Sequence, residues 1–154
     1  MGGLGSPFRW GAVIAMMALV AGCARAAPAA ELTLEQLKAR VSSASIGEKP
    51  RLCVLIAERQ LTEADKLYAA AESEKGQADL SDVTAYSELA RDYAIRSHKH
   101  EKQTEIAVRG MIRKLSDLLH TLPHDERAPV QDAVGRLQRV RDDLLLAMFP
   151  KAAK

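Results

Sequence analysis

The sequence predicts an all-α protein, an antiparallel helical bundle of about four long helices plus a short N-terminal helix. Apolar residues recur at steps of three and four along most of the chain after residue 32. Aromatic residues make up only 4% of the 154 residues, and a core of Leu, Val, Ile and Ala suits packed helices better than a β-sandwich. The connections between the apolar stretches are short, which favours antiparallel neighbours.

Local signals define the first two predicted helices. Thr33 and Gln36 have the spacing of a capping box, in which a hydroxyl and an amide satisfy free backbone donors at a helix start. We therefore expect a short helix over about 34–43. The second helix is predicted from about Pro50 to Lys75, because proline is well tolerated in a first helical turn. We expect it to end at Gly76, since glycine readily adopts the left-handed conformation of a helix terminus.

Three further helices are expected. The third is predicted over about 79–97, and the polar run 98–102 that follows is either a link or an exposed turn within a longer helix. The fourth has the clearest amphipathic pattern and ends before Pro123. After a connection over 123–129, the fifth closes near Pro150. The apolar positions of these last two helices are Val108, Met111, Ile112, Leu115, Leu118, Leu119, Leu122, Val130, Ala133, Val134, Leu137, Val140, Leu144, Ala147 and Met148.

The first 22 residues have the order of a secretory signal peptide. Arg9 and the amino terminus are the only charges before the apolar stretch Trp10 to Ala21. That stretch is shorter than the roughly 20 apolar residues that a transmembrane helix needs. We therefore expect residues 1–22 to be removed and the protein to be exported.

The end of this stretch, Val20-Ala21-Gly22-Cys23, resembles the lipobox of bacterial lipoproteins. The resemblance implies that a signal peptidase recognises Val20, Ala21 and Gly22. It also implies that the nucleophilic thiol of Cys23 takes a diacylglyceryl group and that cleavage leaves this cysteine as the first residue. Two alternatives are cleavage at a later small-residue site, which gives a soluble exported protein, and an uncleaved anchor.

Three segments follow from this interpretation: a signal peptide over 1–22, a lipidated cysteine with its tether over 23–31, and a helical bundle domain over 32–150. The tether is small and proline-interrupted. By the same resemblance, Ala24 after the cysteine, in place of Asp, favours the outer membrane over the inner membrane. We expect the anchored domain to lie on the periplasmic face.

Ala64, Tyr68 and Ala71 have a small, aromatic, small spacing that resembles the second helix of a tetratricopeptide repeat. That family would imply stacked helical hairpins with a concave peptide-binding groove. The sequence departs from its pattern upstream and at Gly76, where the family has proline, and no second copy follows about 34 residues on. An ordinary helical hairpin is the alternative. The domain also resembles small uncharacterised exported helical proteins of bacteria, which implies no activity.

The candidate ligand and thiol residues do not form a known catalytic pattern. His98 with His100, and His120 with His124, form two small clusters without cysteine or an HExxH arrangement, so we expect solvated histidines and no metal site. There is no CxxCH for covalent haem, and we expect no cofactor. Cys53 is either a small core residue or, in an oxidising compartment, a link between two chains; its apolar neighbours favour the core.

Charge gives little indication of a nucleic-acid partner. The 22 basic and 20 acidic side chains nearly balance. Lys99, Lys102, Arg109 and Arg113 can align on the fourth helix as a basic stripe against anionic headgroups. Glu101 lies among these cations, and so does Glu105, the expected ion-pair partner of Arg109. A solvated helix face is therefore favoured over the basic stripe.

No phosphate-binding, dinucleotide-binding or nucleophile-elbow motif is present in the sequence, and we expect no enzyme. The sequence therefore favours a non-catalytic helical interaction module of the bacterial cell envelope, tethered to a membrane through lipidated Cys23. Its expected partner is another envelope protein or its own copies. The alternative is a small-ligand or metal carrier that uses the bundle interior.

Overall fold

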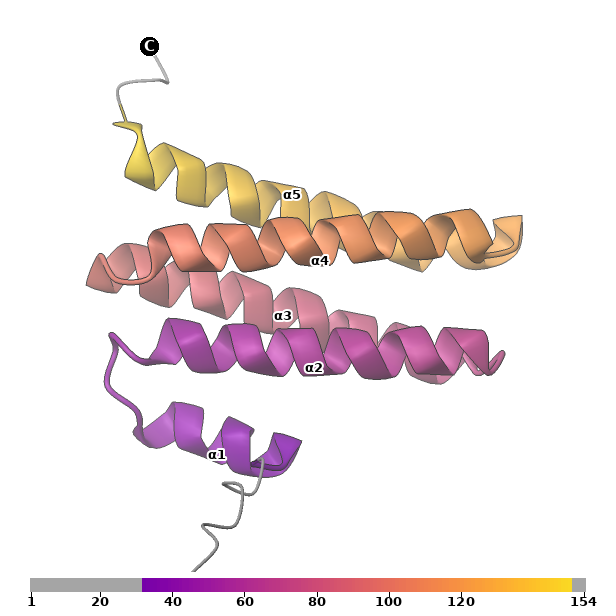
Figure 1. Ribbon diagram of the computed structural model, residues 1–154, viewed down its shortest axis with the longest axis horizontal. Helices are drawn as coiled ribbons and strands as arrows, with labels where there is room; N and C mark the ends of the chain where they lie inside the picture. Colours follow the sequence, from indigo (N-terminus) through magenta and orange to yellow (C-terminus); the bar gives the residue numbers. More distant parts are fainter. Residues whose placement is uncertain (1–31, 151–154) are drawn as a thin grey trace, which may run out of the picture. The chain divides into compact units, whose positions relative to one another are not determined.

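The computed structural model describes residues 32–150, which form five α-helices, one short 3-10 helix and, within that range, no strand. None of the described helices is both long and apolar enough to cross a membrane. The elements are α1 (Leu34–Ser43), α2 (Lys49–Ala69), α3 (Ser73–Ser97), α4 (Glu101–Thr121), η1 (His124–Glu126) and α5 (Arg127–Met148), and Figure 1 shows them in order.

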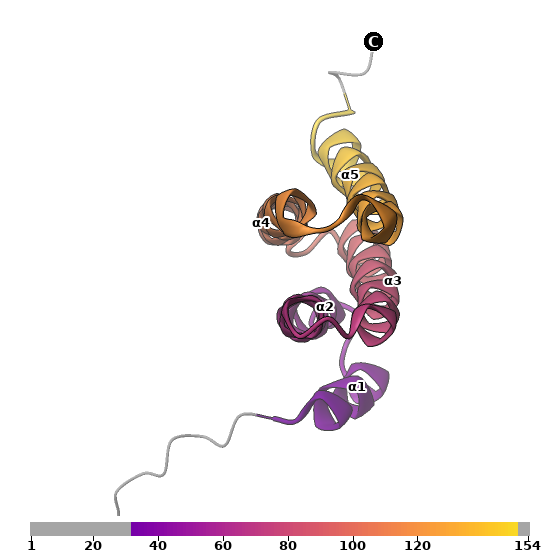
Figure 2. The same cartoon turned by 90° about the vertical axis from the view of Figure 1, so that its right-hand side faces the viewer.

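The helices form a bundle of two antiparallel hairpins, α2 with α3 and α4 with α5 (Figure 1). Viewed from the end, α2 and α4 lie on one side and α3 and α5 on the other (Figure 2). The hairpins meet mainly through α3 and α5, whereas α2 and α4 share fewer contacts, and α1 packs against α2. The predicted fold class, an all-α helical bundle, is confirmed.

Apolar side chains from α2 to α5 form the main core, and a smaller cluster lies under α1. The smaller cluster consists of Leu37, Val41, Cys53, Ile56 and Ala90. Fully buried side chains of the main core include Val83, Val108, Leu115, Val130, Leu137 and Leu144. Burial of each large aliphatic side chain contributes about 1.5–3 kcal/mol, which holds together helices that are individually short.

The helix α1 has the predicted bounds and the predicted cap. The backbone N–H of Gln36 donates to Thr33 Oγ1 at 3.2 Å, and the N–H of Thr33 donates to Gln36 Oε1 at 2.9 Å. Two polar contacts fix α1 on the hairpin below it: Lys38 Nζ reaches Asp82 Oδ2 at 3.1 Å, and Arg59 donates to the carbonyl of Leu32.

The predicted boundary between the second and third helices is wrong. Helix α2 ends at Ala69 and α3 already begins at Ser73, because Ala71 adopts the left-handed conformation with a φ of 59°. Gly76 lies inside α3 and terminates nothing. A Cβ atom at position 76 would lie 2.9 Å from the ring of Tyr68, so the glycine allows that ring to pack against the helix backbone.

The two later connections are also settled. The run after α3 is a link, because His98 and His100 have φ angles of 52° and 63° and α4 begins at Glu101. Helix α5 begins at Arg127, before the predicted end of the last connection. Pro129 therefore lies in its first turn, where the missing N–H has no helical acceptor to lose.

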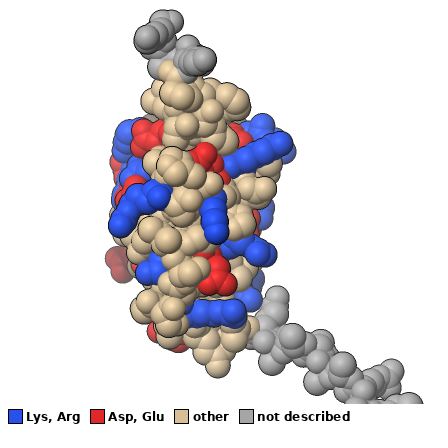
Figure 3. Space-filling model, turned by 90° about the vertical axis from the view of Figure 1, so that its left-hand side faces the viewer, with Lys and Arg blue, Asp and Glu red and all other residues tan. Residues whose placement is uncertain are grey.

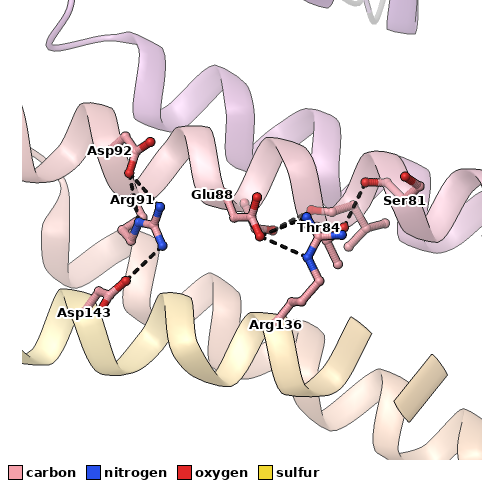
Figure 4. A network of polar contacts seen from close by, with 9 residues as sticks. Ser81, Thr84, Glu88, Arg91, Asp92, Arg136 and Asp143 are labelled. Atoms are coloured by element: carbon pink, nitrogen blue, oxygen red, sulfur yellow. Dashed lines mark hydrogen bonds and ion pairs between the residues drawn. The ribbon is translucent and has the colours of Figure 1, made fainter. Parts of the chain in front are cut away.

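Ion pairs join the two hairpins on the α3–α5 side (Figure 4). Arg136 donates to Glu88 at 2.9–3.0 Å, and Arg91 bridges Asp92 and Asp143 at 2.8–2.9 Å. These contacts add to the apolar packing of α3 on α5. The helices α2 and α4 share fewer contacts on the other side of the bundle, and the candidate site lies there.

Candidate interaction groove between α2 and α4

Two hollows lie between α2 and α4, which run parallel because the antiparallel helix α3 connects them. The N-terminal hollow, of about 700 Å3, is bordered by the end of α1, the first half of α2 and the start of α4. The C-terminal hollow, of about 410 Å3, is bordered by the second half of α2 and the end of α4. We refer to both hollows and the α4 face between them as the α2–α4 groove.

The N-terminal hollow combines an apolar wall with polar edges. Leu52, Val54 and Leu55 line it from α2, and Leu55 keeps 36% of its surface exposed. Gln103 and Thr104 line it from α4. A mixed wall of this kind contacts both the apolar and the polar side chains of a partner, as interface surfaces do.

The charges at the edge of this hollow have a defined arrangement. Hydrogen bonds from the Ser45 hydroxyl and backbone N–H, at 2.8 and 3.3 Å, lower the pKa of Glu48. The nearby Arg40 and Arg51 act in the same direction. The Glu48 carboxylate is therefore ionised at neutral pH and held by the α1–α2 turn, and the two arginines line the same hollow.

The C-terminal hollow is smaller and more acidic. Leu61 and Leu118 provide its apolar surface, while Asp65, Asp117 and Lys114 provide its charges. All five residues come from α2 and α4. The charges of the first hollow balance, with Arg40 and Arg51 against Glu48 and Glu58, whereas carboxylates are in the majority at the second.

Gly110 lies on α4 between the two hollows. It lies seven residues after Gln103 and four before Lys114, which places it on the same face of α4. A Cβ atom at this position would meet nothing within 4 Å. The surface of α4 is therefore open at this position, which lies between the two hollows along the helix.

The predicted lipobox residues Val20, Ala21, Gly22 and Cys23 lie outside the described residues. Cys53 is fully buried in the cluster under α1, which agrees with a core residue. Burial raises the pKa of its thiol to about 11. The thiol is protonated at neutral pH and inaccessible, so it is a poor candidate for a link between chains.

The four histidines do not converge. His98 and His100 lie in the α3–α4 link, His120 at the end of α4 and His124 in η1. Within the described range, no three metal-ligating side chains are grouped closely enough to hold an ion. His100 borders the N-terminal hollow, a placement that the sequence did not indicate.

The basic stripe on α4, which was the alternative to the favoured solvated face, is interrupted by an ion-pair network. Arg109 lies 3.7 Å from Glu105, as its spacing predicted, and Arg141 of α5 lies 3.0 Å from the same carboxylate. The Glu105 side chain is only 8% exposed. Arg109 is therefore part of the α4–α5 contact, and the stripe does not extend along the whole helix.

By its fold and groove, the protein is an all-α bundle with an open surface between two parallel helices. No protein-family model matches the chain, and neither a curated protein nor a solved structure does. Of the residues with tetratricopeptide-like spacing, Ala64 and Tyr68 are buried in α2, whereas Ala71 lies in the turn beyond it. The three residues therefore do not share one helix.

Proposed function

We propose that this protein is a non-catalytic interaction module of the bacterial cell envelope and that the α2–α4 groove is its partner-binding surface. The observation that carries this proposal is the pair of hollows along α2 and α4, with Leu55 exposed at the wall of the larger one. Closing such a surface would increase the stability of the bundle, because each apolar side chain transferred from water contributes to folding. An open surface of this kind therefore favours a binding role.

Lipidation of Cys23 completes the proposal. An anchored domain is confined to the membrane surface, which raises its effective concentration near partners in the same envelope. The proposed partner is an envelope protein that presents an amphipathic segment to the groove. The excess of carboxylates at the C-terminal hollow favours a segment with a basic residue near Asp65 and Asp117, and the mixed charges of the N-terminal hollow accept both signs.

A photo-crosslinking amino acid at Gln103 tests the groove directly, because this exposed residue lines the N-terminal hollow. The matched control is Gln138, an exposed glutamine on α5 that lines neither hollow. In intact cells we expect a defined adduct from position 103 and none from position 138. Equal adduct patterns from both positions, or no adduct from either, would contradict the proposed binding surface.

The tether requires a separate measurement. Intact mass of the protein from the membrane fraction is expected to correspond to a chain that starts at Cys23 and carries a lipid. The Cys23→Ala variant is expected to lose this mass and to leave the membrane fraction. A mature protein without Cys23 would contradict the tether and leave the groove experiment unaffected.

The alternative function, a carrier for a small ligand or metal ion, makes a different prediction. The N-terminal hollow has a volume in the range of small-molecule sites, although it opens at the surface and is not part of the bundle interior. Native mass spectrometry of the purified full chain separates the two functions. A bound ion or small molecule that is lost in a Leu55→Arg variant would favour the carrier.

A further inference from the structure

One end of the bundle is rich in exposed cations. The C-terminus of α1, the N-termini of α2 and α4 and the C-terminus of α3 meet there: Lys99 packs over Gly47, and Lys49 lies 5.1 Å from the ring centre of Tyr93. Figure 3 views this end, where Lys and Arg side chains lie around uncharged surface with Asp and Glu side chains between some of them. We call it the basic end, because its cations Arg40, Lys49, Arg51, Arg96, Lys99 and Lys102 outnumber the carboxylates that lie among them in the sequence, Glu48 and Glu101.

Exposed apolar side chains gather in the same half of the molecule. Ile46 in the α1–α2 turn is 44% exposed, and Leu146 and Phe149 at the end of α5 are 52% and 58% exposed. Arg141 of α5 contacts Glu105 near the start of α4, which places the end of α5 beside the basic end. The other large exposed apolar residues of the described part, Leu55, Leu89 and Ile106, also lie in this half.

The opposite end has a different character. Its cations Lys66 and Lys75 are each paired with the glutamate three residues earlier, Glu63 and Glu72, and Lys114 and Arg127 also lie in this half. No large apolar residue of the described part is exposed there. Its remaining acidic residues include Asp65, Glu74, Asp117, Asp125, Glu126 and Asp132. The nearly neutral chain is therefore polarised along the helix axes.

We propose that the basic end docks on an anionic phospholipid surface, with Ile46 and Phe149 among the headgroups and the cations around them. Lys and Arg near an anionic leaflet are attracted to it, and their long apolar stems tolerate the interface. Large apolar side chains strengthen such binding by entering the boundary between headgroups and acyl chains. This surface shares Arg40 and Arg51 with the α2–α4 groove but also includes the link after α3 and the end of α5, and the inference goes beyond the proposed partner binding.

The combination of features favours lipid over other anionic partners. A nucleic acid would be held by the cations through its phosphates but would leave Ile46 and Phe149 in contact with water. The apolar residues come from a turn and from a helix end, and they are separated by cations. A bilayer surface accommodates scattered apolar residues of this kind without a matching pocket, because each one inserts on its own.

Vesicles of defined composition test the docking with the full chain purified from membranes. An environment-sensitive fluorophore is attached at Ile46→Cys, in the turn at the basic end, or at Ala70→Cys, in the turn at the opposite end. Cys53 is buried and remains unlabelled, and the chain without an added cysteine measures any background. The comparison between vesicles with anionic phospholipid and vesicles of phosphatidylcholine alone changes only the headgroup charge and keeps the attachment constant.

In anionic vesicles we expect a blue-shifted emission and protection from aqueous iodide at position 46 and not at position 70. The protection should fall with added salt. The double charge reversal Lys99→Glu and Lys102→Glu should lower the ratio of docked to undocked protein by roughly tenfold or more. The control Lys66→Glu and Lys75→Glu, with the same net charge change at the opposite end, should leave the ratio within about twofold.

Three outcomes would overturn the proposal. The first is equal protection of both probes, and the second is protection at position 46 that persists in phosphatidylcholine vesicles. The third is protection of position 46 by polyglutamate together with no protection by anionic vesicles. That result would assign the basic end to an acidic protein. None of these outcomes affects crosslinking at Gln103, so failure of the docking and failure of the groove are distinguishable.

Discussion

Two glycines inside helices provide a sharp test of the packing, because the same substitution should have opposite effects at the two positions. A Cβ atom at Gly110 of α4 would meet nothing within 4 Å. A Cβ atom at Gly76 of α3 would lie 2.9 Å from Cδ2 and from Cε2 of Tyr68. The ring has little room to move, because Tyr68 is only 6% exposed and belongs to the main core.

The expected magnitudes follow from two competing effects. Alanine is favoured over glycine in a helix interior by about 1 kcal/mol, and at Gly110 nothing opposes this gain. At Gly76 the gain is smaller because the residue lies in the first turns of α3. Overpacking of a core typically costs about 1–3 kcal/mol. We therefore expect Gly110→Ala to raise the free energy of unfolding by about 0.5–1 kcal/mol and Gly76→Ala to lower it by about 1 kcal/mol.

Thermal unfolding followed by circular dichroism measures the difference. For a domain of this size, 1 kcal/mol corresponds to a change in Tm of about 3–6 °C. Gly135→Ala on α5 is a second control, since its Cβ would also meet nothing within 4 Å. If Gly76→Ala raised the Tm as much as the two controls do, the contact between Tyr68 and the α3 backbone would be wrong.

Three further substitutions test the core, the buried ion pair and an acidic cluster. Leu115→Asp is expected to lower the Tm by at least about 15 °C, because Leu115 is fully buried and loss of a core leucine alone costs about 3–5 kcal/mol. The control Arg113→Asp, on the exposed face of α4, should change the Tm little. Equal Tm values for the two variants would refute the assignment of the buried face. Glu105→Ala should cost about 2–4 kcal/mol in urea unfolding, since it leaves arginines at the α4–α5 contact without their buried partner. The exposed pair lost in Asp143→Ala should cost about 0–1 kcal/mol, and a larger loss than for Glu105→Ala would contradict this ranking. Burial and neighbouring carboxylates raise the pKa of Asp79, so its ionised form opposes folding. The free energy of unfolding should therefore increase as the pH falls toward 3.8, the ordinary pKa of an aspartate. Asp79→Asn should raise the Tm at pH 7 and make the free energy of unfolding increase less as the pH falls. A Tm for Asp79→Asn below that of the parent chain at pH 7 would contradict this sign.

Features encoded within a few residues were predictable from the sequence. The cap at Thr33 fixed the start of α1, and the seven-residue apolar spacing of α4 identified its buried face. Gly76 was misinterpreted because glycine serves two purposes. From the sequence, Gly76 was expected to end a helix in the left-handed conformation. In the structure it lies inside α3 and leaves room for the Tyr68 ring of α2 to pack against the helix. Ala71, which has no such propensity, takes the left-handed conformation instead.

The groove was not predictable because it depends on the spacing of α2 and α4, which are not consecutive in the chain. Helix periodicity identifies which face is apolar, but it does not indicate how closely a distant helix approaches that face. Leu55 is one residue before the buried Ile56, and nothing in the local pattern distinguishes a core leucine from one left at the edge of a hollow. The basic end likewise depends on which helix termini meet.

The groove and the basic end share two residues, so the surfaces for partner binding and membrane docking overlap. Arg40 and Arg51 border the N-terminal hollow and also belong to the basic end. A domain docked by this end would hold the N-terminal hollow beside the headgroups and direct the acidic C-terminal hollow away from them. The basic part of a partner segment would then lie at the C-terminal hollow, away from the lipid. Lys99 and Lys102 line neither hollow, so charge reversal at these positions separates membrane docking from partner binding.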